Sequence, residues 1–364
     1  MMVLEAVDLV ACLFILLTGL PSNLLAFYTL LLNMSKIMKV RKKPAPIDIL
    51  LFNLTVSDIL LLLFLPFKMI EVTSYMIWPL SPLLCPLTSY FLYGSVYTSI
   101  LFLTAVGVDR YLAVGHPIRY KLNRRPAYAI MASIFIWLLV ISHYGIIYVA
   151  KHQDPKGSHP NSSNASHCYE NFSPDVILPV RLEICLVFFC LPFIITLFCY
   201  VKVIQILNSL PNFPACKKQR AVGLAVATLV SFVICFGPFN VSHIVGFIQN
   251  KGPPWRMEGF LFSAFNASID PVIFYFSSKA IRQTFTDCWN RMRLRLQTLV
   301  PWCRWTCCQS PTNNDEGEGA GEYSSSYLQG KYQVNVAQTE CQKTRTAAPR
   351  NIKTLQDDSQ KEVE

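Results

Sequence analysis

Seven long apolar stretches, separated by short polar loops, constrain the fold of this chain more than any other feature. They cover residues 8–32, 47–70, 83–111, 127–150, 176–204, 219–249 and 257–277. An α-helix rises ~1.5 Å per residue, so about 20 residues cross the ~30 Å hydrocarbon core of a membrane, and each stretch is long enough. Charged residues make up 15% of the chain, against about a quarter in soluble domains. We therefore predict an all-α membrane protein whose residues 8–278 form a bundle of seven transmembrane helices.

The basic residues of the loops indicate the orientation of this bundle. They cluster in alternate loops, after the first, third and fifth stretches. These residues are Lys36, Lys39, Arg41, Lys42 and Lys43, then Arg119, Lys121, Arg124 and Arg125, then Lys202, Lys217, Lys218 and Arg220. Because basic loops stay in the cytoplasm, we expect residues 1–7 to be a short extracellular N-terminus. The net charge of +10 is then a signal of topology, and we expect no nucleic-acid partner.

The loop between the fourth and fifth stretches has the features of an extracellular segment. Asn161, Asn164 and Asn171 each begin an Asn-X-Ser/Thr sequon, and glycosylation there would agree with the charge pattern. Cys168 lies in this loop, and Cys85 lies at the outer start of the third stretch. Both are in an oxidising region, so we predict a disulfide between them.

The chain after Ser278 has the pattern of an amphipathic helix. Apolar residues recur there at helical spacing, opposite Arg and Lys, and they are Ile281, Phe285, Trp289, Met292 and Leu296. We expect this helix on the inner leaflet, within a juxtamembrane segment over residues 279–308. Candidates for palmitoylation are Cys288, Cys303, Cys307 and Cys308. Residues 309–364 are rich in Ser, Gly, Glu and Gln, so we expect a disordered cytoplasmic tail with phosphorylation sites at Ser324, Ser325 and Ser326.

Polar motifs inside the apolar stretches are specific as a set. The third stretch ends "GVDRYLAVGHP", and the seventh carries "NASIDPVIFYF". The other marks are Asn23 in "GLPSNLLAF", Asp58 in "LTVSD", Trp137, Pro192, Tyr200, and Pro238 in "CFGPFN". In these motifs the chain resembles the rhodopsin-like G-protein-coupled receptors. The resemblance implies a plasma-membrane receptor whose partners are membrane lipid, heterotrimeric G proteins (inhibitory or phospholipase-linked) and arrestin, which would bind the phosphorylated tail.

The resemblance also implies a signalling switch at the cytoplasmic end of the bundle. Its residues are Asp109, Arg110, Tyr111 and Tyr200. Arg110 would pair with Asp109 in the inactive state and turn toward the G protein in the active state. The chain departs from the family pattern in Lys218, where some receptors place an acid, and in Phe274, where the family commonly has tyrosine.

A further implied site is the central polar pocket that holds a sodium ion in many family members. The matching residues are Asp58, Ser99, Asn266 and Asp270, with Asn23 beside them. Oxygen ligands suit a hard cation, and two buried carboxylates need compensation. A hydrated hydrogen-bond network without an ion would satisfy the same groups, so both interpretations stay open. No other cofactor is expected.

Charges near the outer ends of the helices indicate an anion site. At ~1.5 Å per residue, His143, Arg181 and His243 lie roughly 8–11 Å from the outer boundary. Arg256 stands at the top of the seventh stretch. Arginines beside a bundle cavity need an anion, and Glu170 of the outer loop could occupy one of them when no ligand is bound. The alternative is that the side chains snorkel to the interface, which accounts for Arg256 better than for Arg181.

The sequence around these charges is similar to the free fatty acid receptor family, most of all to its short-chain members. The similar segments are "LPVRLEICLV", "GPFNVSH" and "CYENF". The resemblance implies that Arg181 and Arg256 anchor a carboxylate, with His243 favouring the short-chain branch. It also implies a flanking His143, and Tyr93 and Tyr97 as lining residues, whereas Phe239 replaces a tyrosine of the short-chain members. We expect acetate, propionate or butyrate, whose few heavy atoms, at up to about −1.5 kcal/mol each, limit affinity to about the micromolar range.

Other functions stay open at this point. Receptors for medium- or long-chain fatty acids, hydroxy acids or nucleotides also have basic pockets. A transporter fits less well, because transporters place charges near the midplane in interrupted helices. No motif combines a nucleophile, a base and an oxyanion site, so we expect no enzyme. Glu183 lies about 200° around a helix from Arg181, and we expect it to face the fourth helix or the interface.

Overall fold

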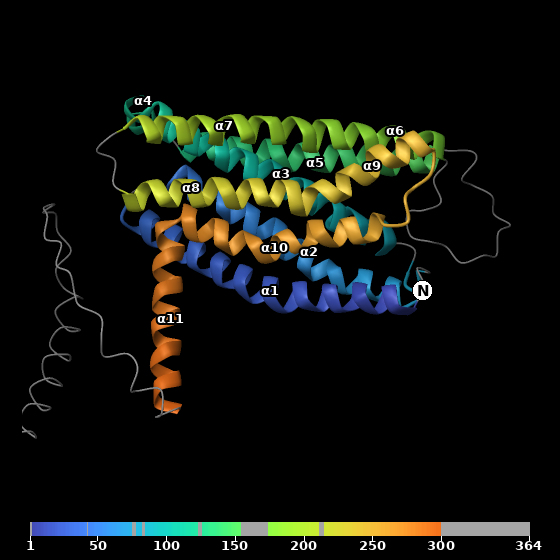
Figure 1. Ribbon diagram of the computed structural model, residues 1–364, viewed down its shortest axis with the longest axis horizontal. Helices are drawn as coiled ribbons and strands as arrows, with labels where there is room; N and C mark the ends of the chain where they lie inside the picture. Colours follow the sequence, from blue (N-terminus) through green and yellow to red (C-terminus); the bar gives the residue numbers. More distant parts are fainter. Residues whose placement is uncertain are drawn as a thin grey trace, which may run out of the picture. The chain divides into compact units, whose positions relative to one another are not determined.

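The computed structural model describes residues 2–41, 43–74, 78–81, 84–122, 126–153, 174–210 and 215–299, and over these residues the chain is built of helices and turns. Figure 1 shows the long helices running side by side. They include seven that are long and apolar enough to cross a membrane. The predicted seven-helix bundle is therefore confirmed.

The first four spans are single helices, and they lie close to the predicted limits except for the first, which extends beyond residues 8–32 at both ends. They are α1 (Met2–Lys39), α2 (Pro46–Thr73), α3 (Leu84–Gly115) and α5 (Pro126–Gln153), with the short α4 (Pro117–Leu122) after α3. Pro46, Pro117 and Pro126 begin their helices, where a proline loses no hydrogen bond because the first amides have no partner in the helix. Helix α1 begins at Met2, so it includes most of the segment 1–7.

The fifth and sixth spans each contain a π-helical turn. The fifth is α6 (Pro174–Cys185), η1 (Leu186–Cys190) and α7 (Leu191–Ser209), and the sixth is α8 (Ala215–Val230), η2 (Ser231–Phe236) and α9 (Gly237–Gln249). Each π turn comes just before a proline, Pro192 or Pro238, at the start of the following helix. Proline lacks the amide that would close the α-helical bond, and a wider turn relieves the clash of its ring with the preceding carbonyl. The extra residue in each π turn rotates the helix that follows it relative to the helix that precedes it.

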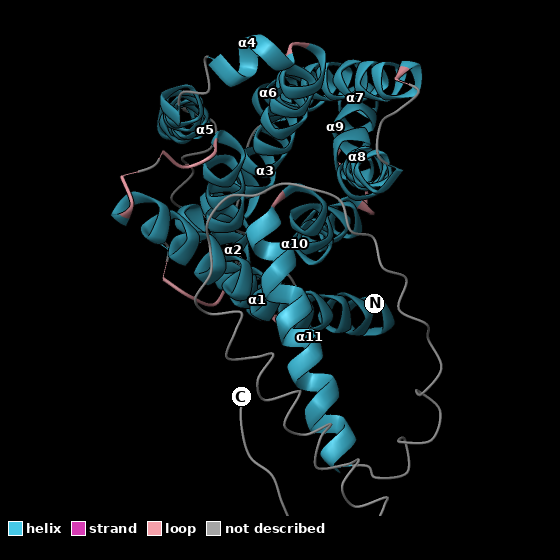
Figure 2. Ribbon diagram, turned by 90° about the vertical axis from the view of Figure 1, so that its left-hand side faces the viewer, coloured by secondary structure: helices cyan, strands magenta, loops and turns pink. Residues whose placement is uncertain are grey.

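The packed core of the bundle is centred on α3. In the apolar part of α3, 72% of the residues are buried, against 22% in α5, which therefore lies at the periphery. Figure 2 views the bundle along its helices. The seventh span, α10 (Arg256–Ser277), packs against α1 and α9, so it joins the first helix of the chain to the sixth span.

Helix α11 (Lys279–Leu299) follows the last span and runs across the direction of the other helices (Figure 1). Ile281 is fully buried against the bundle, whereas Trp289 and Met292 are exposed. Among the described residues, the bundle therefore covers the stripe at its start and leaves it uncovered further along, which is compatible with the predicted interfacial helix. Residues 300–364, with the cysteines at 303, 307 and 308 and the predicted tail, lie outside the described residues.

Candidate ligand-binding site

A cluster of aromatic side chains from α3, α9 and α10 forms the base of the candidate site. Tyr93 stacks on Phe239 with ring centroids 5.8 Å apart, and it meets Phe260 edge-on at 5.0 Å. Phe239 also meets the ring of His243 at 4.6 Å. The residue pairs 93/97 and 239/243 are each four apart, so both helices present their two members on one face. These rings pack α3, α9 and α10 against one another near their predicted outer ends.

Arg256 lies directly on this cluster. Its guanidinium carbon is 5.9 Å from the centre of the Tyr93 ring and 5.7 Å from that of Phe239. Its Nε is buried and has no hydrogen-bond partner among the described residues. Arg256 is also the first residue of α10; its own amide donates to the Pro253 carbonyl at 3.2 Å, and the dipole of the helix start favours an anion. The arginine therefore combines a partly desolvated cation with a helix N-terminus.

His243 and Tyr97 form a buried hydrogen-bonded pair beside Arg256. His243 is 3% exposed, and its Nε2 lies 3.0 Å from the Tyr97 hydroxyl oxygen. The hydroxyl can also donate to Asn240 Oδ1 at 3.4 Å. The Nδ1 of His243 is buried and has no partner in the described part of the chain. Since Tyr97 has one proton to donate, the tautomer of His243 decides whether Nδ1 offers a donor or an acceptor to the site.

Arg181, on α6, also lies near His243 and Tyr97. Its terminal nitrogen lies 3.9 Å from the place that a Cβ on Gly252 would occupy, in the loop that leads to α10. Electrostatic interactions link both Arg181 and Arg256 to His243 and to Tyr97. The structure thus brings together the predicted arginines, His243 and the predicted tyrosines.

His143 is separated from Tyr97 by the ring of Phe188, and its ring lies close to the side chain of Glu183 on α6. The Nδ1 of His143 is 3.9 Å from Oε1 of Glu183, whose side chain is 55% exposed. Glu183 therefore faces the fourth span, as expected. The His143 ring packs 5.0 Å from Phe188, which in turn packs 6.0 Å from Tyr97. Phe188 and Tyr97 therefore lie between His143 and His243. The Nε2 of His143 is buried and has no partner among the described residues.

Sequence reasoning missed a buried ion pair at the outer end of α2. Lys68 and Glu71 are both buried, and Lys68 Nζ lies 2.8 Å from Glu71 Oε2. Lys68 also interacts electrostatically with Tyr93 and Arg256. The sequence indicates this pair, because a lysine and a glutamate three residues apart in an apolar stretch can pair on one helix face. A third cation therefore stands close to the site, already compensated by an acid.

Some predicted residues of the outer region cannot be placed. Glu170, Cys168 and the sequon residues Asn161, Asn164 and Asn171 lie outside the described residues. Cys85 is disulfide-bonded, and its pairing with Cys168 stays a prediction.

The central polar residues are brought together as the family resemblance implied. Ser99 donates to Asp58 Oδ1 at 3.1 Å, and Asn266 donates to Asp270 Oδ2 at 2.8 Å. The Asp58 and Asp270 carboxyls also interact with each other. Four buried oxygens have no hydrogen-bond donor among the described residues, namely Asn23 Oδ1, Asp58 Oδ2, Asn266 Oδ1 and Asp270 Oδ1. A hard monovalent cation or bound water would satisfy these oxygens, so both interpretations of the sequence stay open and the sodium ion stays a prediction.

At the cytoplasmic end, Arg110 crosses to the seventh span. It donates to the carbonyl oxygen of Ser277 at 2.8 Å, while Tyr120 of α4 donates to Asp109 at 2.9 Å. The next residue, Ser278, donates to Asp48 at 3.1 Å. The junction between α10 and α11 is therefore held from both α2 and α3. The other predicted switch residues lie nearby, with the Tyr200 hydroxyl 3.2 Å from that of Thr228 and the Tyr111 ring 5.9 Å from Phe198.

Comparison with known proteins shows that this chain is similar to seven-transmembrane receptors. Residues 22–274 match the family described as "7 transmembrane receptor (rhodopsin family)". The chain is 44% identical to free fatty acid receptor 2 of Rattus norvegicus, over 76% of this chain and 83% of the relative. It is 43% identical to free fatty acid receptor 2 of Homo sapiens, over 86% of this chain and 94% of the relative. It is 37% identical to free fatty acid receptor 3 of Mus musculus, over 84% and 92%.

Proposed function

The chain belongs to the rhodopsin family of seven-transmembrane receptors, and we propose that within this family it is a receptor for short-chain carboxylates such as acetate, propionate and butyrate. As a member of this family it is a receptor rather than an enzyme, and it is a multi-pass protein of the plasma membrane. Its relatives named free fatty acid receptors 2 and 3 support a fatty acid as the class of ligand.

The placement of Arg256 is the observation that carries this proposal. Its guanidinium rests on the faces of Tyr93 and Phe239, and its Nε is buried without a partner among the described residues. A partly desolvated cation is costly unless an anion compensates it. A carboxylate fits the planar fork of a guanidinium with two parallel hydrogen bonds. Arg181 supplies the second positive charge, and Glu170 would be the internal anion in the absence of ligand.

The histidines would complete the polar side of the ligand site. In the tautomer whose Nε2 accepts the Tyr97 proton, in place of Asn240 Oδ1, His243 carries its own proton on Nδ1, the atom that lacks a partner in the described structure. It can then donate to the second carboxylate oxygen. His143, oriented by Glu183, would act at the edge of the site.

The aromatic cluster favours a short acyl chain. Tyr93, Tyr97, Phe239 and Phe260 are packed against one another beneath the arginine, and three of them are almost fully buried. The methylene groups of a ligand bound to Arg256 would meet these rings within a few carbons of the carboxylate. A ligand of so few atoms binds in the micromolar range or more weakly, which suits a sensor of abundant metabolites.

The inner end and the central pocket would carry the response. We assign coupling to heterotrimeric G proteins to the region of Asp109, Arg110 and Tyr111, with Tyr200 as a packing partner, and arrestin binding to the phosphorylated tail. A sodium ion between Asp58, Ser99, Asn266 and Asp270 would stabilise the unliganded receptor, since its ligands come from three different helices.

A dose–response panel tests this proposal. Cells that express the chain receive straight-chain carboxylates from C1 to C16, and G-protein activation and surface expression are both measured. We expect responses to the C2–C4 acids, and we expect Arg181→Ala to abolish them at normal surface level. Lys251→Ala, which removes an exposed cation near the same end of the bundle, is the matched control and should respond like the wild type. Responses only to C10–C16 acids, or an unchanged response of Arg181→Ala, would refute the short-chain carboxylate site.

A further inference from the structure

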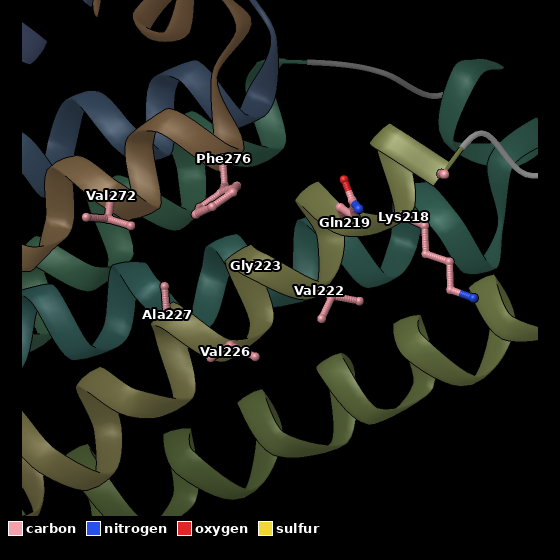
Figure 3. Close-up of a pocket in the computed structure, with 9 residues that line it drawn as sticks. Lys218, Gln219, Val222, Gly223, Val226, Ala227, Val272 and Phe276 are labelled. Atoms are coloured by element: carbon pink, nitrogen blue, oxygen red, sulfur yellow. The ribbon is translucent and has the colours of Figure 1, made fainter.

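The last residues of the seventh span connect it to three other spans at the cytoplasmic end of the bundle. Phe276, Ser277 and Ser278 follow one another where α10 ends and α11 begins. Figure 3 shows Phe276 projecting from α10 toward α8. The Ser277 carbonyl oxygen accepts a hydrogen bond from Arg110 of α3, and the Ser278 hydroxyl donates to Asp48 of α2. Three consecutive residues thus contact the sixth, third and second spans.

Asp48 is a buried carboxylate near the start of α2 that has no role in the proposed ligand site. It is 8% exposed, and its two oxygens accept hydrogen bonds from different elements. Ser278 Oγ donates to Oδ1 at 3.1 Å, and Asn33 Nδ2 of α1 donates to Oδ2 at 3.3 Å. A hydrogen bond to a charged acceptor is stronger than one between neutral groups, and burial strengthens it further. The carboxylate therefore holds the residue between α10 and α11 against the first two spans.

Ser278 is the residue at which the chain turns from α10 into α11. Its backbone is extended, with φ −107° and ψ 128°. Its amide donates to the Phe274 carbonyl at 2.8 Å, and its own carbonyl accepts from the Arg282 amide at 3.2 Å. Asp48 also lies at the start of α11, where the helix dipole favours a negative charge. Because one residue ends one helix and starts the next, the bond to its side chain fixes the position of the turn.

The position of this turn sets the position of the group that binds Arg110. A peptide unit is planar, so the Ser277 carbonyl and the Ser278 amide move as one rigid group. Arg110 donates to this carbonyl at 2.8 Å, and its Nε is buried and has no partner among the described residues. In the described structure the arginine is therefore engaged with the seventh span, through a carbonyl that Asp48 holds in place from the next residue.

Phe276 adds a packing contact to the sixth span. A Cβ at Gly223 of α8 would lie 2.8 Å from the Phe276 ring, closer than a carbon can approach, so the ring packs directly on the helix backbone. The end of α10 is therefore in contact with α8, and the two spans cannot separate here without losing this packing.

We propose that Asp48 is a positioning residue for a latch, formed by Phe276, Ser277 and Ser278, that keeps the receptor in a state that does not activate G protein. Asp48 acts through Ser278, which places the Ser277 carbonyl on Arg110 and the Phe276 ring on α8. Loss of the Asp48–Ser278 hydrogen bond releases the turn, and Arg110 then becomes free for the G protein. This inference rests on the proposed coupling at Arg110, and it adds a residue of α2 to the switch.

Basal G-protein activation, measured without ligand and normalised to receptor at the cell surface, tests the latch. Asp48→Leu removes both acceptor oxygens, so basal activity should rise about fivefold, the factor that the loss of one net hydrogen bond gives in a two-state equilibrium. Ser278→Ala removes only the donor and should give a similar rise. Asp48→Asn keeps an oxygen that can accept from Ser278, so its basal activity should stay closer to the wild type. The double variant of Asp48→Leu and Ser278→Ala should rise no further than Asp48→Leu, because both changes break the same contact.

Matched controls lie on α11, away from the turn. Asp287→Leu and Thr286→Ala remove an exposed carboxylate and an exposed hydroxyl, and both should keep the basal activity of the wild type. Unchanged or lower basal activity of Ser278→Ala at normal surface expression would overturn the latch, and this variant decides the matter if Asp48→Leu does not reach the surface. An equal rise in the two controls would overturn it as well.

The propionate dose–response of the same cells separates this inference from the proposed ligand. Raised basal activity in Ser278→Ala together with no propionate response in the wild type would support the latch and refute the ligand. A normal propionate response together with unchanged basal activity of Ser278→Ala would refute the latch alone.

Discussion

The substitution Arg256→Gln gives the sharpest prediction about ligand binding. The guanidinium carbon of Arg256 lies 5.9 Å from the centre of the Tyr93 ring and 5.7 Å from that of Phe239. Glutamine keeps much of the side-chain volume and polarity but removes the positive charge and the planar fork. The response to propionate should therefore fall steeply, while the fold of the outer end should remain.

The size of the loss follows from the hydrogen bonds that the arginine can make. Each hydrogen bond to a charged group contributes about 1.5–3 kcal/mol, and a bidentate carboxylate forms two of them. Glutamine can replace one of the two with a weaker, neutral bond. A net loss of about 3 kcal/mol remains, which corresponds to an increase of about 150-fold in the half-maximal concentration of propionate.

The assay is the propionate dose–response of G-protein activation, normalised to receptor at the cell surface. Removing the charge also removes the cost of burying an unpaired Nε, so surface expression should equal or exceed that of the wild type. Lys251→Gln is the control, because it neutralises an exposed cation near the same end. A shift of less than about fivefold for Arg256→Gln at normal surface expression would mean that this arginine is not the carboxylate anchor.

Other predictions concern the interior of the bundle. Tyr97→Phe removes the hydroxyl that lies 3.0 Å from His243 Nε2, so the half-maximal propionate concentration should rise about 5- to 20-fold with little change in melting temperature. An unchanged dose–response would argue against a role for this histidine. Asp58→Asn should abolish the effect of sodium on the thermal stability of the purified receptor, and a persisting sodium effect would exclude the central pocket as its site. Gly223→Ala places a Cβ 2.8 Å from the Phe276 ring and should lower the free energy of unfolding by about 1–3 kcal/mol. The double variant with Phe276→Leu should recover this stability in thermal unfolding, and no recovery would mean that this contact is not the cause.

Element positions along the chain were predictable because they depend on length and hydropathy. The spans, the helix after Ser278 and the similar depth of the outer charges all follow from the ~1.5 Å rise of an α-helix. The π-helical turns before Pro192 and Pro238 did not follow, although both prolines stand inside predicted spans. A proline predicts that a hydrogen bond is lost, but the surrounding helices decide whether the backbone kinks or inserts an extra residue.

Contacts between helices were less predictable than positions along them. The sequence identified Arg181 and Glu183 as charges on different faces, and the structure pairs Glu183 with His143 of the fourth span. Arg110 was expected to pair with its neighbour Asp109, and its hydrogen bond to Ser277 runs to a helix 167 residues later in the chain. The pair of Lys68 and Glu71 was visible as spacing but was overlooked among apolar residues.

By itself, the sequence determined the number of spans, their expected orientation and the class of receptor, because hydropathy, loop charge and motifs act locally along the chain. Only the tertiary structure decided which side chains meet. Helical periodicity sets the spacing of residues on one helix, but the rotation of each helix about its axis and the identity of its neighbours come from packing. For that reason the arginine over the aromatic cluster and the close contact of Phe276 with Gly223 could be recognised only when the helices were seen together.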